Sequence, residues 1–170
     1  MKLLPISLIV LALLAACSPS SQFTPTAQTN FEAKSAEAAR QTLEDFFSIL
    51  ASGKYAEAGY YYGSDYDTLI NMNPDIDPND HSALWKAGCE FNGFQCKLSL
   101  RSAVVKDQSG DRIQFTVEFN NPDGSLFILG PCCGEDATEM PPVSKFEYLL
   151  SWTEDDGGRF VVMTMPVYVP

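Results

Sequence analysis

Apolar side chains recur every three or four positions in the part of the chain that begins near Phe31. The positions that share this spacing are Ala36, Ala39, Leu43, Phe46, Phe47 and Leu50. A stripe of this period predicts one amphipathic helix that buries a single face. Thr29 and Glu32 are spaced as a capping box at its start, and Gly53 is a residue that commonly ends a helix.

Two further helices are expected before the middle of the chain. A short one over residues 54–62 follows Gly53 directly. Residues 64–80 are acidic and rich in Asn and Pro, which predicts an irregular segment with room for a turn of helix. Asp80 is a preferred N-cap residue, and it is expected to begin a third helix that runs through Trp85 to Cys89.

Beyond Cys96 the apolar positions change to a period of two, which is typical of strands with one buried face. Two segments alternate cleanly, and their apolar members are Ile113, Phe115, Val117 and Phe119 in the first and Phe146, Tyr148, Leu150 and Trp152 in the second. Residues 98–105, 126–129 and 160–169 predict three more strands, the first less regular, the second short and the third apolar on both faces.

Turn sequences rich in Gly, Asp and Asn separate these strands. They lie at residues 108–110, 121–124 and 155–158. Each is typical of a β-hairpin, so the strands are expected to form an antiparallel meander. Helices first and strands afterwards predict an α+β domain over residues 31–170, in which the helices pack on one face of about five strands.

The first sixteen residues have the pattern of an export signal. Lys2 is followed by an apolar run and two alanines, and the run is too short to span a bilayer as a helix. Residues 1–16 are therefore expected to be a signal peptide that is removed. The sequence Leu-Ala-Ala-Cys that ends at Cys17 resembles the lipobox of bacterial lipoproteins. The resemblance implies a diacylglyceryl thioether on Cys17, cleavage before it and acylation of the new amino terminus.

A lipidated Cys17 would hold the protein on the extracytoplasmic side of the cell envelope, because two or more acyl chains anchor a protein durably. Ser18 follows it, where enteric bacteria use aspartate to retain a lipoprotein at the inner membrane. The outer membrane is therefore expected in a host that has one. After the cysteine, residues 17–30 form an uncharged linker rich in Ser, Thr and Gln, which cannot bury enough surface to order itself.

The charge balance restricts the partners of this protein. The chain has 22 acidic and 11 basic side chains and a formal net charge of −11. Such a field repels polyphosphates and anionic headgroups, so nucleic acid is not an expected partner. Contact with the membrane is expected through the lipid anchor.

The opening helices carry a second resemblance. The stretch AEAARQTLEDFFSILASGKYAEAGYYYG, residues 36–63, resembles the nuclear-transport-factor-like superfamily, which includes ketosteroid isomerases. The resemblance implies a strongly curved sheet that wraps on the helices as a cone around an apolar pocket. The candidates to line that pocket are Tyr60, Tyr62, Asp65 and Trp85. The acidic segment and two cysteines within residues 64–96 depart from the general pattern of that superfamily.

Four cysteines remain once Cys17 is assigned to lipid, and an even number in an exported chain indicates disulfides. Cys89 and Cys96 flank a stretch with Asn-Gly at its centre, which can reverse the chain, so a bridge between them is favoured. Cys132 and Cys133 could then close a vicinal disulfide, since two glycines and a proline surround them. Cross-pairing of these two cysteines with Cys89 and Cys96 is the open alternative.

The sequence favours a non-enzymatic domain that binds either a small apolar ligand or an envelope protein. The alternative is a small isomerase or dehydratase, for which the single histidine, His81, lies next to Asp80. The spacing of the cysteines and acids matches neither a zinc nor a calcium site, so no metal and no cofactor is expected. Residues 160–169 are apolar on both faces, which is compatible with a homodimer.

Overall fold

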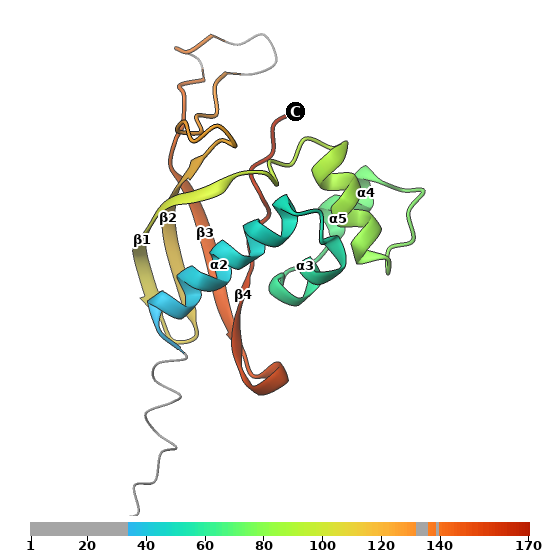
Figure 1. Ribbon diagram of the computed structural model, residues 1–170, viewed down its shortest axis with the longest axis vertical. Helices are drawn as coiled ribbons and strands as arrows, with labels where there is room; N and C mark the ends of the chain where they lie inside the picture. Colours follow the sequence, from blue (N-terminus) through green and yellow to red (C-terminus); the bar gives the residue numbers. More distant parts are fainter. Residues whose placement is uncertain (1–33, 132–135, 139) are drawn as a thin grey trace, which may run out of the picture.

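A computed structural model describes residues 34–131, 136–138 and 140–170. Within these residues the protein has an α+β fold, in which four α-helices precede a four-stranded antiparallel sheet (Figure 1). The helices are α2 (Ala36–Ala51), α3 (Tyr55–Tyr61), α4 (Asp67–Met72) and α5 (His81–Glu90). The strands are β1 (Ser99–Ser109), β2 (Arg112–Asn120), β3 (Phe146–Thr153) and β4 (Arg159–Val162).

Helix α2 is the amphipathic helix that the spacing of three and four predicts. It begins at Ser35, whose hydroxyl accepts a hydrogen bond from the backbone N–H of Ala38 at 3.1 Å. Gly53 ends it with a φ of +70°, a conformation that glycine adopts without strain. The capping box expected from Thr29 and Glu32 lies outside the described residues.

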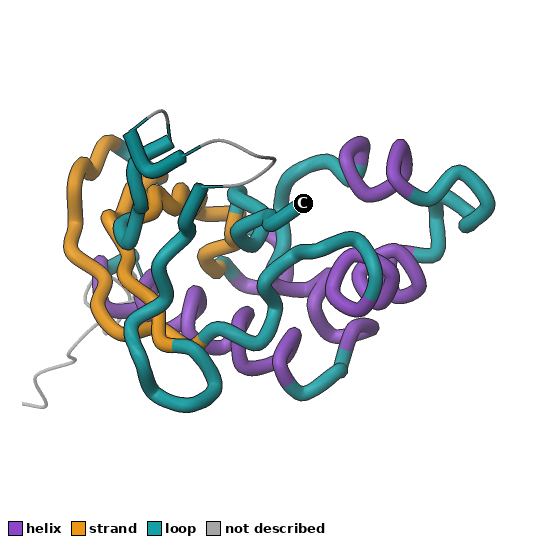
Figure 2. The backbone as a smooth tube through the Cα atoms, turned by 90° about the horizontal axis from the view of Figure 1, so that it is seen from above, coloured by secondary structure: helices purple, strands orange, loops and turns teal. Residues whose placement is uncertain are grey.

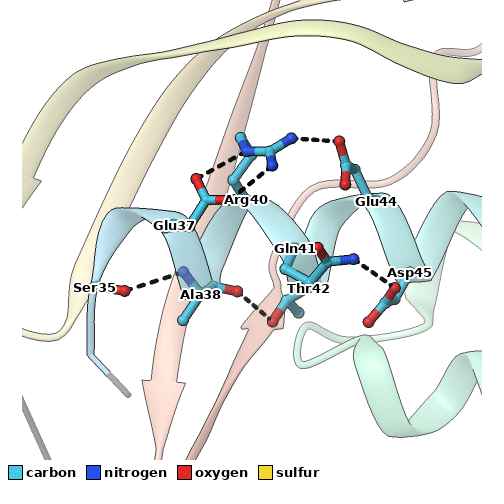
Figure 3. Close-up of polar contacts among 8 residues, drawn as sticks. All are labelled: Ser35, Glu37, Ala38, Arg40, Gln41, Thr42, Glu44 and Asp45. Carbon is cyan, nitrogen blue, oxygen red and sulfur yellow. Dashed lines mark hydrogen bonds and ion pairs between the residues drawn. The ribbon is translucent and has the colours of Figure 1, made fainter. Parts of the chain in front are cut away.

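The solvent-facing side of α2 carries ion pairs and a hydrogen bond between side chains three or four positions apart (Figure 3). Arg40 bonds Glu37 at 2.7 Å and reaches Glu44 one turn further along. Gln41 donates to Asp45 on the same helix at 3.0 Å. Pairs at this spacing lie next to each other on a helix, and at an exposed position each contributes little to stability.

The next three helices agree with the prediction from the sequence, except that α4 is slightly longer than expected. Helix α3 falls within the expected residues 54–62, and Asp80 caps α5 by accepting a hydrogen bond from the N–H of Ala83 at 2.9 Å. Between them, the six residues of α4 form slightly more than the single turn expected for the acidic segment. Its buried Leu69 packs in the core, and this tertiary contact stabilises a helix too short to be stable alone.

The sheet has the strand order β1-β2-β3-β4 with every neighbouring pair antiparallel. The alternation in β2 is confirmed, because Ile113, Phe115, Val117 and Phe119 are all buried. In β3, Tyr148 and Leu150 are buried on the same face, with Phe146 and Trp152 partly covered at its ends. Helix α2 lies across these strands, whereas α3, α4 and α5 lie beyond β4 (Figure 1 and Figure 2), so one helix rather than all of them covers the sheet.

Two of the expected strands do not form as predicted. Residues 126–129 make just the isolated bridges Asn120↔Leu126 and Leu129↔Val143, so the turn at 121–124 does not lead into a sheet strand. β4 ends at Val162 rather than continuing to residue 169. The hydroxyl of Thr164 accepts the N–H of Leu149 at 3.0 Å in place of a strand bond, and Pro166 further along has no N–H to offer.

The described strands therefore number four rather than about five. They form an open sheet with β1 and β4 at its edges, and they do not confirm the cone. The core lies between α2 and the sheet, where Phe47 meets Phe119 and Tyr148 with ring centroids 4.7 Å and 5.6 Å away. Within the described ranges, no helix has both the length and the apolar character that crossing a bilayer requires.

Candidate functional site

An aromatic cluster occupies the position where the sequence predicts a pocket. Trp85 of α5 is fully buried, and its indole N–H donates a hydrogen bond to the hydroxyl of Tyr66 at 3.2 Å. The ring of Tyr62 meets that of Trp85 edge-on at 5.1 Å and stacks on Phe46 of α2 at 6.2 Å. These four rings contact one another directly, so aromatic side chains fill the space between α2, α3 and α5.

The hydroxyl of Tyr62 is a neutral donor rather than a base. The pKa of Tyr62 is raised to about 12, mainly by burial; a hydrogen bond with Ser64 lowers it, and the charge of nearby Asp65 adds a smaller increase. A phenol with this pKa keeps its proton across the physiological range. Tyr62 therefore lacks the ionised form that proton abstraction would require.

The other two pocket candidates lie at the surface. Asp65 is exposed, and its carboxylate accepts the backbone N–H of Asp67 at 3.2 Å, which helps to start α4. Tyr60 is 47% exposed, and its ring faces the guanidinium of Arg159 at 4.0 Å from the centroid. The structure thus brings Tyr62 and Trp85 together, leaves Asp65 at the margin of the cluster and places Tyr60 against the β3–β4 hairpin.

Asp80 and His81 do not form a catalytic pair. Asp80 uses its carboxylate as the N-cap of α5. The imidazole of His81 stacks instead on the ring of Tyr66, with centroids 3.8 Å apart and planes inclined by 8°. The two neighbouring residues thus have separate partners, both of them structural.

The favoured disulfide is confirmed. Cys89 and Cys96 are bonded, with their Cα atoms 5.4 Å apart. The bridge joins the last turn of α5 to the segment that leads into β1. Cys17, Cys132 and Cys133 lie outside the described residues, so lipidation of Cys17 and the vicinal disulfide stay predictions.

A hollow between α2 and the start of β1 was not expected from the sequence. It is a surface groove, open to solvent, with a volume of about 400 Å³. We call it the α2–β1 hollow, and its lining residues are Glu44, Phe47, Ser48, Ala51, Ser52, Lys97, Leu98, Ser99 and Leu100. A neighbouring space of about 300 Å³ shares Ala51 and Lys97 with it and includes the disulfide.

Two features of the sequence point to this surface. From Lys97 to Lys106 the chain has three basic residues and no acid, although acids are twice as frequent as bases overall. The imperfect alternation over residues 98–105 was a second sign, because the pairing of β1 with β2 shifts register at two places in β1. Both features describe β1 itself, and the helix that completes the hollow is distant in sequence.

Comparison with protein-family models, with curated proteins and with solved structures found no match for this chain. Among the described residues, no group of three or more His, Cys, Asp or Glu side chains is arranged to hold a metal ion. No charged side chain in that part of the protein is buried. The α+β fold, the filled aromatic cluster and the surface hollow are therefore the features on which a function can be argued.

Proposed function

We propose that the protein is an extracytoplasmic lipoprotein, anchored through Cys17, whose folded part binds an envelope protein at its surface without chemistry. The anchor rests on the signal-like residues 1–16 and on the cysteine that follows them. The bonded Cys89 and Cys96 support this location, since stable disulfides form mainly in oxidising compartments.

The filled aromatic cluster is the observation that favours a binding site on the surface of the protein over a ligand site in its interior. A small apolar ligand needs an enclosed cavity of a few hundred cubic ångströms, on the order of 300 or more. Trp85, Tyr62, Tyr66 and Phe46 fill the corresponding space. The isomerase or dehydratase alternative needs an ionisable group in such a cavity, and the exposed Asp65 does not supply one.

Detergent phase partition of the full chain tests the anchor. We expect the wild-type protein in the detergent phase, with the N-terminal peptide heavier by its acyl chains in mass spectrometry. Cys17→Ala should move the protein to the aqueous phase, while Ser18→Ala, the matched control, should not. Detergent-phase behaviour of Cys17→Ala would disprove the lipid anchor at that residue.

Titration with an apolar fluorescent probe, N-phenyl-1-naphthylamine, tests the absence of an internal ligand site. A filled cluster predicts no saturable binding by the wild-type protein in its native state. Saturable binding at one probe per chain would favour the small-ligand function over binding of an envelope protein. Light scattering on the same samples tests the homodimer that residues 160–169 suggested.

A further inference from the structure

Strand β1 is an edge of the sheet, with β2 as its one neighbour among the described residues (Figure 1). Val104 and Val105 in its centre are 65% and 42% exposed. An edge strand presents backbone N–H and C=O groups that have no partner within the sheet. The described part of the protein thus has a free row of hydrogen-bonding groups beside exposed apolar side chains.

The regular part of this edge is short. The pairing of β1 with β2 is in continuous register from Ser102 to Val105. It shifts between Leu100 and Ser102 on one side, and between Val105 and Asp107 on the other. Bulges of this kind twist an edge away from long pairings, so they limit an added strand to about four residues.

The same edge is basic in a strongly acidic protein. Lys106 is neutralised by Glu147 at 2.5 Å. Arg101 donates to the side-chain oxygen of Asn120 at 3.0 Å, and that amide carries no charge. In the described part of the chain, no carboxylate lies within 4.0 Å of the charged nitrogens of Arg101 or Lys97. Arg101 on the strand and Lys97 just before it are therefore cations that form no ion pair with any described residue.

The α2–β1 hollow opens beside the first residues of this strand. Phe47, Leu98 and Leu100 give it apolar walls, and Lys97 stands on its rim. The acid among its lining residues, Glu44, is already paired with Arg40. A ligand segment in which an apolar side chain lies next to a carboxylate would fit here, because the apolar side chain would meet the walls and the carboxylate would meet Lys97.

We propose that the edge of β1 and the α2–β1 hollow bind an extended acidic segment of a partner protein. The segment adds a strand beside Ser102–Val105, its carboxylates meet Lys97 and Arg101, and one of its apolar side chains enters the hollow. This inference rests on the proposed function, since it names the chemistry of the partner. A second copy of β1 is disfavoured as the occupant, because it would bring the same basic residues to the same edge.

Fluorescence anisotropy on the full chain in a nonionic detergent tests the proposal. The probe is a fluorescein-labelled hexapeptide of alternating glutamate and valine. We expect saturable binding that weakens as ionic strength rises. The matched peptides replace glutamate by lysine, which reverses the charge, or valine by proline, which removes backbone donors, and neither should bind.

Charge-reversal variants locate the site. Lys97→Glu combined with Arg101→Glu should weaken binding by about tenfold or more. Lys86→Glu on α5, an exposed lysine outside β1, is the control and should change it less than about twofold. Hydrogen exchange should show protection within residues 102–105 when the acidic peptide is bound.

Four results would overturn the proposal: no saturable binding, equal losses in the control and the double variant, protection elsewhere on the chain, or a dimer that protects residues 102–105 without peptide. None of these readouts involves Cys17 or the aromatic cluster. Failure here would therefore leave the lipid anchor and the filled interior standing, and those are tested by phase partition and probe titration.

Discussion

Lys34 and Glu154 are 120 positions apart in the sequence, yet the Lys34 ammonium lies 3.1 Å from the Glu154 carboxylate. The same ammonium bonds Asp111 at 3.1 Å and lies 5.0 Å from the centre of the Trp152 ring. Trp152 in turn donates its indole N–H to Glu154 at 2.9 Å. Lys34 thus ties the start of α2 to both hairpin ends of the sheet.

This contact should depend on pH at both extremes. Hydrogen bonds from Lys34 and Trp152 lower the pKa of Glu154 below its ordinary 4.5, and bonds to Asp111 and Glu154 raise the pKa of Lys34 above 10.5. The contact between Lys34 and Glu154 therefore stabilises the fold fully between pH 4.5 and pH 10.5. It is lost as pH falls through the folded pKa of Glu154, and again as pH rises through that of Lys34.

The indole N–H resonance of Trp152 reports the acid side of this titration. We expect it to shift below pH 4.5, with a midpoint lower than that of an unperturbed glutamate. Glu154→Gln should abolish the shift. Asp123→Asn removes a different carboxylate with a lowered pKa, bonded to Ser125, and should leave it unchanged. An unaltered titration in Glu154→Gln would show that the contact does not form in solution.

Trp85 should be among the most costly residues to truncate. It is fully buried against Phe46, Tyr62 and Tyr66, and it also donates a hydrogen bond. We expect Trp85→Ala to lower the free energy of unfolding by about 3–5 kcal/mol in urea denaturation. Phe91→Ala is the matched control, because Phe91 is 77% exposed, and its cost should be within about 0.5 kcal/mol.

The same variant also tests whether the cluster is what excludes an apolar ligand. Removing the indole leaves a cavity lined by aromatic rings, and apolar cavities of this kind admit apolar molecules. Provided that it stays folded, Trp85→Ala should bind N-phenyl-1-naphthylamine when the wild-type protein does not. Equal probe binding by both proteins would mean that Trp85 does not fill the candidate pocket.

Local sequence signals predicted the regular elements because each of them depends on nearby residues. The spacing in α2, the alternation in β2, the cap at Asp80 and the short disulfide loop are all of this kind. Residues 160–169 are an exception. Their composition is typical of a strand, but their pairing is decided by Thr164 and Pro166.

The site was less predictable for the same reason. Tyr62 and Trp85 are both candidates to line the pocket that the resemblance implies, but the sequence does not show whether their rings border an open pocket or fill it. That depends on Phe46, which comes from another helix. The α2–β1 hollow likewise joins Phe47 to Leu98, and neither local periodicity nor a motif connects two such positions.

Gly93 holds the last residues of the chain against the disulfide loop. Its φ is +87°, and a Cβ added there would lie 2.2 Å from the carbonyl oxygen of Val169. Val169 also donates its N–H to the Gly93 carbonyl at 3.1 Å. An alanine at this position would therefore suffer both an unfavourable backbone conformation and a collision with backbone atoms.

Gly110 separates these two effects. It also has a positive φ, +55°, but nothing lies within 4 Å of its added Cβ. Gly110→Ala should cost about 1 kcal/mol for the backbone alone, whereas Gly93→Ala should cost about 2 kcal/mol more. Urea midpoints measure both, and equal costs would mean that the chain end moves aside freely.

The Cys89–Cys96 bridge should stabilise the fold by restricting the unfolded chain. The two cysteines are seven positions apart, and a loop of this length is worth about 2–3 kcal/mol in the chain-entropy account. We expect the double variant Cys89→Ala with Cys96→Ala to lose about that much in urea denaturation. Reduction of the wild-type protein should produce a similar loss.

Peptide mapping without reductant distinguishes this bridge from cross-pairing. The fragment pair that contains Cys89 and Cys96 should appear in the wild-type protein and persist when Cys132→Ala and Cys133→Ala are introduced together. Because the loop is closed within one segment, that second double variant should leave the stability due to the bridge unchanged. A fragment that links Cys89 or Cys96 to the 132–133 pair would contradict the disulfide and would require a different path for the chain that enters β1.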